Sequence, residues 1–377
     1  MHSNLVATEK NTTQNPKSSA MITTNTNDSP HRSFGLDLAR TVAISLVLIS
    51  HFGHNSLDAL GFWGVELFFA LSGFLIGQIL WRNFSRTDNW SKDQILNFWQ
   101  RRWWRTLPNY YLFFIVLLII TFLNNESIPS LKTLFKFIWF GQSLLNRDWG
   151  FYSVSWSLCI EEWFYLIFPL LLLLFSTLVH NRRVSFILSL IAICLGSIVI
   201  RNILANQHPT ADLRSITFAR LDAIAYGVLT SFIVVVYKTT SKQKVVALII
   251  GILFQTCSVA YVILAGLTHI ITSKIFLIAV PLGFALIIPY FSLIESPKNN
   301  NFISTIIEKI SLWSYSIYLS HAPIMWLFYS LLKNYRNNFY GNLFSKIISL
   351  AITLIASAIL YNFFEIPFTK KRPKELR

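Results

Sequence analysis

Ten long apolar segments constrain this chain more than any other feature of its sequence. A helix needs about 17 to 25 mostly apolar residues to cross the hydrocarbon core of a membrane. Only 13% of the 377 residues are charged and 54% are hydrophobic, which leaves too little polar surface for a water-soluble protein of this length. We therefore predict an all-α membrane protein with about ten transmembrane helices. They are expected near residues 35–52, 61–80, 107–123, 152–179, 184–200, 218–237, 245–264, 271–294, 311–332 and 343–364.

Two shorter segments and both ends of the chain differ from these apolar runs. Residues 90–105 mix Trp and Phe with Arg and Lys, as in a helix lying in the membrane interface, whereas residues 131–140 are too few to cross. The N-terminal residues are rich in Asn, Thr and Ser, and no apolar stretch precedes Phe34, so no cleavable signal is predicted. The expected parts are a disordered tail over 1–33, a transmembrane domain over 34–366 and a basic tail over 367–377.

The positive charge of the chain, formally +15, gathers in short segments between the apolar runs. With ten spans, four basic segments lie on the same side of the membrane as the N-terminal tail. They are residues 82–105, 182–183, 238–244 and 370–377. Lys and Arg are enriched in cytoplasmic loops, so we predict that both termini are cytoplasmic. Neither zinc-finger spacing nor an RNA-binding signature occurs, which argues against a nucleic-acid partner. The three cysteines lie far apart without CxxC spacing, so no disulfide framework and no metal site are predicted.

Arg40 and His51 are ionisable residues within the first apolar segment. Eleven residues on a helix correspond to about 16 Å and three full turns, so the two side chains face almost the same way. Ionisable groups inside a membrane are costly and often functional. The ordinary alternative is that Arg40 reaches toward the interface with Asp37 as its partner, while His51 caps the helix near water. Their shared face favours a joint role, with Arg40 in the cytoplasmic half and His51 near the outer end.

The second and fourth apolar segments each contain carboxylates. Glu66 lies among aromatic residues and is expected either to pair with Arg40 or to line a cavity. Glu161 and Glu162 point about 100° apart on a helix, so at least one of them faces the interior. Tyr165, one turn after Glu161, would share its cavity. The alternative is that both carboxylates reach water at the outer edge of the span, although about eight largely apolar residues precede them.

Arg102 and Arg105 follow the second span in a segment that also contains Arg101 and several tryptophans. Residues at i and i+3 project from the same helix face. Two guanidinium groups on one face suit a polyanion such as a phosphate-rich cofactor. The alternative is that these basic residues hold an interfacial helix against anionic lipid, with the tryptophans as anchors.

The remaining ionisable residues within apolar segments have more ordinary explanations. Arg220 and Asp222 begin the sixth segment, where an internal ion pair or interface charges explain them as well as a functional role does. His321 stands alone in the ninth segment, where a histidine more often satisfies a neighbouring backbone or hydroxyl group. Gly73 and Gly77 have the spacing that allows two helices to approach closely.

Taken together, these residues resemble the acyltransferase 3 family of membrane acyltransferases. The resemblance runs in order from residue 36 to about residue 325 and is specific as a set. Glu66 stands where Asp is common in such proteins, which keeps the charge and changes its reach. The resemblance rests on Asp37 with Arg40 and His51, and on the segments GVELFFALSGFLIG, RRWWRTLP, WSLCIEEWFYLIFP, RLDAIAYG and SYSIYLSHAPI.

The resemblance implies transfer of an acyl group, often acetyl, from cytoplasmic acyl-CoA to a hydroxyl of a glycan or lipid-linked glycan. It implies an essential role for His51 and Arg40, and for the pair Arg102 and Arg105. A bacterial inner membrane is then the expected location. The expected partners are membrane lipids, acyl-CoA as the donor co-substrate and a glycan acceptor. No permanently bound cofactor is expected.

On that basis we expect His51 to accept the proton of the attacking hydroxyl, with Glu161 or Glu66 orienting its ring. Direct attack by the acceptor and an acyl-histidine intermediate both remain open. The candidate residues fall into three groups. They are His51, Arg40, Glu161 and Glu66 for catalysis, Arg101, Arg102 and Arg105 for the donor, and Glu162, Tyr165, Arg220 and His321 for the substrate.

A transporter or flippase for a glycan or lipid is the alternative function, because intramembrane ionisable residues also mark transport paths. Paired repeats with broken helices would favour it, and the sequence shows no convincing pair. The outer loops near 124–150 and 201–217 offer candidate acceptor-lining residues, although exposed polar positions are the more ordinary account. These residues are Arg147, Asp148, Trp149, His208 and Arg214.

Overall fold

The computed structural model describes residues 33–87, 90–146, 150–210, 212–266, 272–297, 302–336 and 338–376. The predicted tail up to residue 32 and the loop residues Arg147, Asp148 and Trp149 lie outside the described residues. Within the described ranges, the regular structure is helical and contains no strand. Its longer helices are α1 (Phe34–Phe52), α2 (Leu60–Arg86), α3 (Lys92–Leu123), α4 (Leu131–Ile138), α5 (Ser155–Leu178), α6 (Arg182–Gln207), α7 (Leu221–Val236), α8 (Ser241–Ala265), α10 (Phe276–Phe291), α11 (Phe302–Leu331), α12 (Phe339–Leu360) and α13 (Ile366–Lys370). Short helical turns are η1 (Asn55–Leu57), η2 (Leu213–Ser215), η3 (Lys333–Tyr335) and the π-helical turn η4 (Tyr361–Glu365).

The helices confirm the all-α membrane class. Seven helical segments of the described chain are long and apolar enough to cross a membrane, and they contain α1, α2, α3, α5, α6, α8 and α12. The other three predicted spans are also helices. Of these, α7 and α10 have 16 residues each, and α11 is long enough but too polar to count among the seven. The count of ten spans therefore stays a prediction.

The short length of α7 has a physical reason. Sixteen residues extend about 24 Å, less than the roughly 30 Å of a hydrocarbon core. Most of α7 is buried against other helices, including both of its first residues, Leu221 and Asp222. A helix enclosed by its neighbours has little contact with lipid, so its length need not match the membrane thickness.

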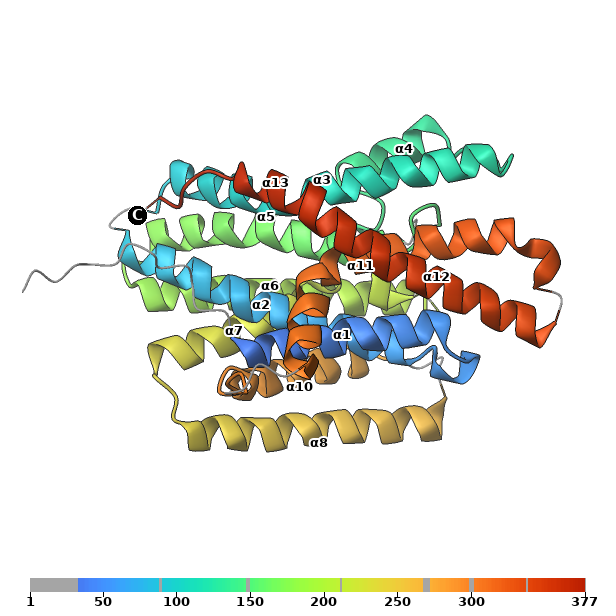
Figure 1. Ribbon diagram of the computed structural model, residues 1–377. Helices are drawn as coiled ribbons and strands as arrows, with labels where there is room; N and C mark the ends of the chain where they lie inside the picture. The colour runs from blue at the N-terminus through green and yellow to red at the C-terminus, as the bar shows by residue number, and fades with distance from the viewer. Residues whose placement is uncertain are drawn as a thin grey trace, which may run out of the picture. The chain divides into compact units, whose positions relative to one another are not determined.

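The expected interfacial helix over residues 90–105 is not a separate element. It forms the first half of α3, which continues through Pro108 to Leu123 as one helix of 32 residues. A proline is tolerated within such a helix where neighbouring groups replace the lost hydrogen bond. Residues 131–140 are short, as expected: α4 has eight residues and packs beside α3, with Tyr110 donating to the carbonyl of Phe137 at 2.8 Å (Figure 1).

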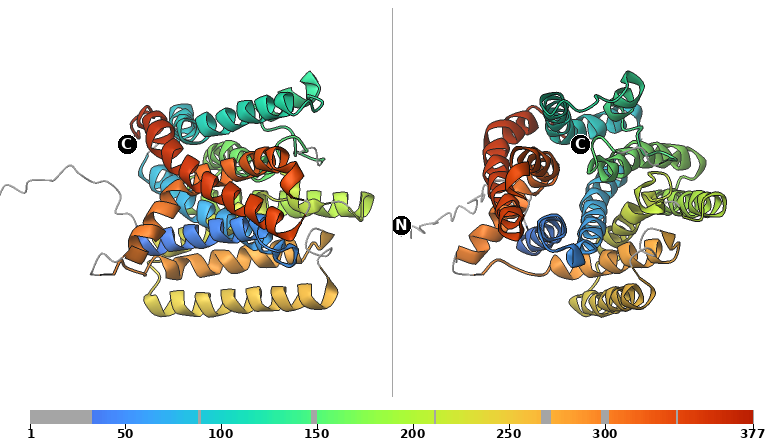
Figure 2. Two further views of the ribbon diagram at one scale, coloured as in Figure 1. Left: turned by 45° about the vertical axis from the view of Figure 1, so that its right-hand side comes forward. Right: turned by 90° about the vertical axis from the view of Figure 1, so that its right-hand side faces the viewer.

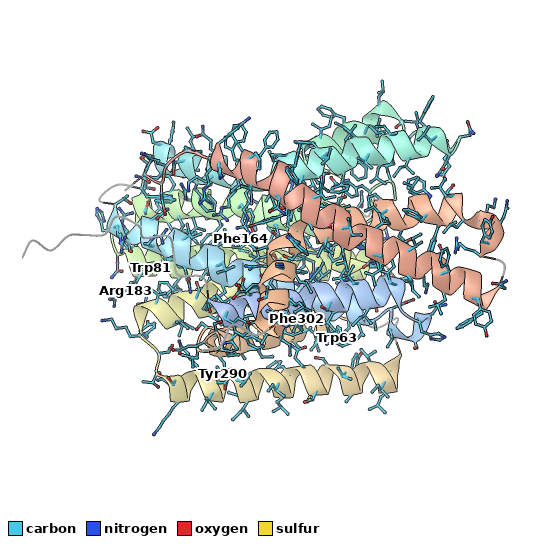
Figure 3. All side chains as sticks on the ribbon, in the orientation of Figure 1. Trp63, Trp81, Phe164, Arg183, Tyr290 and Phe302 are labelled. Carbon is cyan, nitrogen blue, oxygen red and sulfur yellow. The ribbon has the colours of Figure 1, made fainter. Side chains whose placement is uncertain are left out.

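The long helices of residues 33–376 run roughly along a common direction (Figures 1 and 2). In the end-on view of Figure 2, α2 lies inside the bundle, where it packs against α1, α7, α10, α5 and α6. The first turns of α11 cross the bundle before the helix turns to lie along it (Figure 1). Figure 3 shows Trp81 and Phe164, both buried, among the helices, and the exposed Arg183 at one end.

Glycines set the contact between α2 and α7. A methyl group on Gly73 would collide with the backbone oxygen of Ile224, and one on Gly227 would collide with the backbone oxygen of Ala70. Both helix backbones therefore touch at positions where only glycine fits. This contact confirms the packing role expected for Gly73 from its spacing.

We expect the substitution Gly73→Ala to lower the free energy of unfolding by about 1 to 3 kcal/mol, because the added methyl forces α2 and α7 apart. Thermal unfolding of the purified protein in detergent measures the change. Gly196→Ala is the matched control, since a methyl at Gly196 on α6 meets nothing within 4 Å. Equal unfolding temperatures for the two variants would show that the close contact does not exist.

Candidate active site

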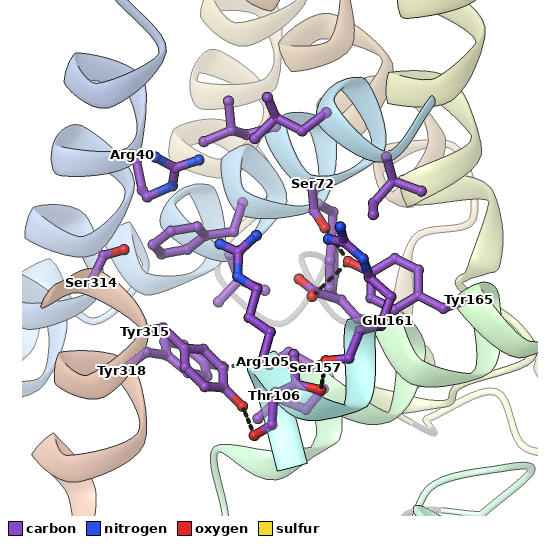
Figure 4. A pocket seen from close by; sticks show the side chains of 18 residues that line it. Arg40, Ser72, Arg105, Thr106, Ser157, Glu161, Tyr165, Ser314, Tyr315 and Tyr318 are labelled. Carbon is purple, nitrogen blue, oxygen red and sulfur yellow. Dashed lines mark hydrogen bonds between the residues drawn. The ribbon is translucent and has the colours of Figure 1, made fainter. Parts of the chain in front are cut away.

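A central pocket gathers polar side chains from five helices. It lies between α1, α2, α3, α5 and α11, and apolar residues of α2 complete its wall. Figure 4 shows Arg105 extending from α3 toward the side on which Arg40 of α1 lies. The polar lining consists of Arg40, Ser72, Arg102, Arg105, Thr106, Ser157, Glu161, Tyr165, Ser314, Tyr315 and Tyr318.

Arg102 and Arg105 both line this pocket, as their shared helix face predicts. Arg102 is only 8% exposed, its guanidinium lies 5.8 Å from the centre of the Phe98 ring, and its Nε has no hydrogen-bond partner. In the described part of the chain, neither arginine forms an ion pair. A buried guanidinium without a carboxylate is costly unless an anion completes it. Arg105 beside it is exposed, so the buried Arg102 guanidinium is the one that lacks a counter-charge, and the two together can receive an anionic ligand.

Arg101 does not belong to this pocket, so its predicted contact with the donor finds no support in the geometry. It points to the segment 371–376, donating to the carbonyl of Pro373 at 2.7 Å and approaching Glu375 at 3.8 Å. Burial acts to raise the pKa of Glu375, but a hydrogen bond from Arg82 and the charges of Arg82 and Arg101 hold it below its usual range. Arg101 thus anchors a neighbouring segment, because it lies about 100° around the helix from Arg102.

Glu161 lies in the central pocket with Tyr165, as expected. The Tyr165 hydroxyl donates to Glu161 Oε2 at 3.0 Å and lies 2.5 Å from Ser72 Oγ. Glu162 is buried as well, but it faces a second pocket between α3, α5 and the end of α4, which several tryptophans line. Its Oε1 has no partner there. The two adjacent carboxylates therefore face different cavities, as the angle of about 100° between neighbouring residues on a helix predicts.

Arg40 forms the ion pair with Asp37 that the sequence indicated, at 3.1 Å. Its guanidinium also donates to Ser311 Oγ at 3.0 Å, and that hydroxyl donates to Asp37 at 2.7 Å. These contacts fix the side chain between α1 and α11 while it still lines the central pocket. Arg40 is thereby held in place at the wall of the pocket that faces Arg105.

His51 lies at the far end of α1 from Arg40 and contacts another histidine. Its ring centroid is 4.9 Å from that of His321 on α11, and the planes are tilted by 42°. His321 is fully buried and touches Tyr318, which also lines the central pocket. The two histidines, which lie 270 residues apart in the sequence, thus meet beside the pocket.

The expectation that Glu161 or Glu66 orients His51 is wrong in this structure. Glu161 is hydrogen-bonded to Tyr165. Glu66 lies deeper in the bundle, where Arg220 Nη2 donates to both of its carboxylate oxygens at 2.5 Å. Among the described residues, His51 has no carboxylate within hydrogen-bond distance.

Glu66 and Arg220 form a fully buried ion pair, so Glu66 neither pairs with Arg40 nor lines the central pocket. Arg220 also donates to the carbonyl of Leu277 at 2.7 Å. A second buried pair joins Asp222 to Arg201 at 2.5 Å. For Arg220 and Asp222 the sequence left an internal ion pair, interface charges and a functional role open, and the structure places them in two separate ion pairs. Their partners come from other helices and tie α7 to α2 and α6.

We expect Glu66→Gln to lower the free energy of unfolding by about 3 to 5 kcal/mol, because it leaves the Arg220 guanidinium buried without a counter-charge. Unfolding in detergent measures this loss. The double variant Glu66→Leu with Arg220→Met should recover most of the stability, since it removes both charges and keeps their volume. A Glu66→Gln protein as stable as the unmodified one would contradict the pair.

Sequence reasoning missed several site residues on α11. Ser314, Tyr315 and Tyr318 line the central pocket, with Tyr315 donating to the carbonyl of Thr106 at 2.7 Å and Tyr318 lying 2.6 Å from Ser157 Oγ. A signal was present. Ser314, Tyr318 and His321 recur at helical spacing, so they share one face of α11.

Comparison with known proteins shows the family to which the chain belongs. A family model described as an acyltransferase domain, that of acyltransferase 3, matches residues 33–362. O-acetyltransferase OatA of Staphylococcus aureus, in strains NCTC 8325 and COL, is 29% identical over 377 residues. These alignments cover 91% of this chain and 58% of OatA, so the chain spans little more than half of that relative's length. No solved structure matches the chain. The chain is a membrane protein that belongs to the acyltransferase 3 family.

Proposed function

We propose that this protein transfers an acetyl group from acetyl-CoA to a hydroxyl of a carbohydrate. The observation that carries the proposal is the pair Arg102 and Arg105, which lines a pocket with Glu161 and, within the described residues, forms no ion pair. Family membership supports acyl transfer. The name of the S. aureus relative supports an oxygen acceptor and an acetyl group.

The arginine pair suits the phosphate groups of CoA. Guanidinium groups bind phosphate through paired, charge-assisted hydrogen bonds. With the phosphates at Arg102 and Arg105, the pantetheine arm extends into the central pocket past Glu161 and Tyr165. Tyr318 lines the pocket and contacts His321, which in turn contacts His51. In this arrangement the thioester approaches His51 from the inside of the bundle.

His51 acts in this proposal as the base. The oxygen of the acceptor hydroxyl attacks the thioester carbonyl carbon, and His51 takes the hydroxyl proton. A carbon–oxygen bond forms, the carbon–sulfur bond breaks, and His51 returns the proton to the CoA sulfur, which leaves as the thiol. Proton transfer to a positioned base contributes about 10²- to 10⁴-fold to the rate. The exposure of His51 at the end of α1 leaves it accessible to a large acceptor.

The proposed orientation follows from the basic segments. Arg82 and Arg101 both contact Glu375 of the segment 371–376, so these basic residues lie together at one end of the bundle. The charge of Arg105 also acts on Arg372 of that segment. Placing that end in the cytoplasm of a bacterial cell agrees with the enrichment of Lys and Arg in cytoplasmic loops. The donor then comes from the cytoplasm, and the acceptor, a surface polysaccharide or lipid-linked glycan, comes from outside the inner membrane.

Purified protein in detergent with acetyl-CoA tests the function. A thiol-reactive dye reports free CoA, and the acceptors are soluble oligomers of glucose, N-acetylglucosamine and uronic acid. The proposal predicts CoA release that depends on an oligosaccharide, with an acetyl ester on the sugar found by mass spectrometry. Movement of a glycan across vesicles without CoA release would instead support the transporter alternative and overturn the proposal.

A further inference from the structure

His321 is a fully buried histidine that takes no part in the reaction proposed above. It lies on α11 near the end of α1, and its ring contacts the rings of both Tyr318 and His51. Its Nδ1 is 3.2 Å from the carbonyl oxygen of Ile317, and its Nε2 has no hydrogen-bond partner. A buried polar atom without a partner is uncommon and costs about 1 to 3 kcal/mol.

The contact with Ile317 determines which nitrogen of His321 carries the proton. A carbonyl oxygen only accepts hydrogen bonds, so Nδ1 must be the N–H donor. In a neutral imidazole the other nitrogen is then an acceptor with a free lone pair. Nε2 is the atom at the far tip of the ring from its own backbone. The ring of His51, on the helix α1 that packs against α11, lies 4.9 Å from the His321 ring, measured between centroids.

We propose that His321 is a positioning residue for His51: its Nε2 accepts a hydrogen bond from one ring N–H of His51, which leaves the other nitrogen of His51 free to take the acceptor proton. The ring distance of 4.9 Å allows this bond after a small rotation of the exposed His51 side chain. This inference rests on the proposed function, and it assigns the orienting role expected of a carboxylate to a neutral imidazole.

Other charged groups near the pair do not offer the same contact. Arg214 on η2 and Asp58 after η1 act electrostatically on His51, and the Tyr318 ring also contacts His321. Asp58 forms no ion pair with His51 in the described part of the chain. The Arg214 guanidinium lies over the rings of Phe62 and Trp156, at 5.0 and 4.8 Å. Burial lowers the pKa of Arg214, against the charges of Glu66 and Asp212. A cation cannot accept a hydrogen bond, so Arg214 cannot replace His321.

Three substitutions at His321 test the proposal, with kcat and KM for acetyl-CoA measured by CoA release. The amide of Gln reaches the position of Nε2 and can accept there, whereas the shorter Asn reaches only the position of Nδ1. His321→Ala and His321→Asn should each lower kcat by about 100-fold, at the lower end of what a general base contributes, with KM unchanged. His321→Gln should retain at least ten times the kcat of His321→Asn.

The pH dependence of kcat provides a readout that a purely structural role would not move. An acceptor on the His51 N–H favours the protonated ring, so its loss lowers the pKa that governs the acidic limb. The limb should move to lower pH in His321→Ala and return toward the original position in His321→Gln. Thermal unfolding in detergent identifies any variant that has lost its fold.

The outcomes separate the inference from the function on which it rests. If the unmodified protein releases no CoA with any oligosaccharide, the proposed function fails first. If the unmodified protein is active, but the folded His321→Gln and His321→Asn variants have equal kcat and the acidic limb of their pH profiles does not shift, His321 does not position His51. A Gln variant as inactive as the Ala variant would make His321 itself a proton carrier and would also overturn the positioning role.

Discussion

Replacing His51 with Ala is expected to lower kcat for acetyl transfer by about 10²- to 10⁴-fold, the range that a positioned general base contributes. The His51 side chain is exposed at the end of α1 and packs against His321 rather than into the core. The variant should therefore still fold and accumulate in the membrane. Radiolabelled acetyl transfer, normalised to the amount of purified protein, measures the loss.

His54→Ala is the matched control for this prediction. His54 lies three residues further along, is also exposed, and accepts a hydrogen bond from the Ser56 backbone at 3.3 Å. It touches neither His321 nor the central pocket, so its loss should leave kcat unchanged. Full activity of the His51→Ala protein, or an equal loss in both variants, would remove His51 from the reaction.

Replacing Arg102 and Arg105 together with Ala is expected to raise KM for acetyl-CoA by about 100-fold or more. Each hydrogen bond to a charged group contributes about 1.5 to 3 kcal/mol, and the double variant removes at least two. Once the donor is bound, His51 is unaffected, so kcat at saturating donor should change much less than KM. Initial rates of CoA release over a range of acetyl-CoA concentrations separate the two constants.

Arg101→Ala is the control, because Arg101 has the same charge and helix but contacts Pro373 and Glu375 outside the pocket. It should leave KM for acetyl-CoA unchanged. A rise in KM as large as that of the double variant would mean that the whole basic segment attracts the donor through its charge alone. An unchanged KM in the double variant would leave Arg102 and Arg105 as lipid anchors.

Relations within one helix could be predicted from the sequence, because they depend only on helical periodicity. Three pairs lie together as their spacing indicates: Arg102 with Arg105, Glu161 with Tyr165, and Asp37 with Arg40. The long apolar runs likewise predicted the helices, since crossing a membrane requires such runs. Among the helix bounds, the separation of 90–105 from the following span was wrong, as α3 continues through Pro108.

Contacts between helices could not be predicted in the same way. Glu66 meets Arg220, and His51 meets His321, across gaps of 154 and 270 residues. These partners are set by which helices are adjacent and by their rotation about their axes, and hydrophobicity alone determines neither. The close approach of α2 and α7 at Gly73 is one cause, since it brings the start of α7 beside Glu66.

In the proposed reaction, acetyl groups pass from CoA on one side of the membrane to a hydroxyl on the other. Proteoliposomes test it directly, with labelled acetyl-CoA outside and oligosaccharides enclosed inside, because neither molecule crosses the lipid. Only protein molecules inserted with Arg102 and Arg105 toward the outside of the vesicle can then bind the labelled donor and react. Labelled acetyl esters should then form on the enclosed sugars. Labelled esters that form only when donor and oligosaccharide share one side would contradict it.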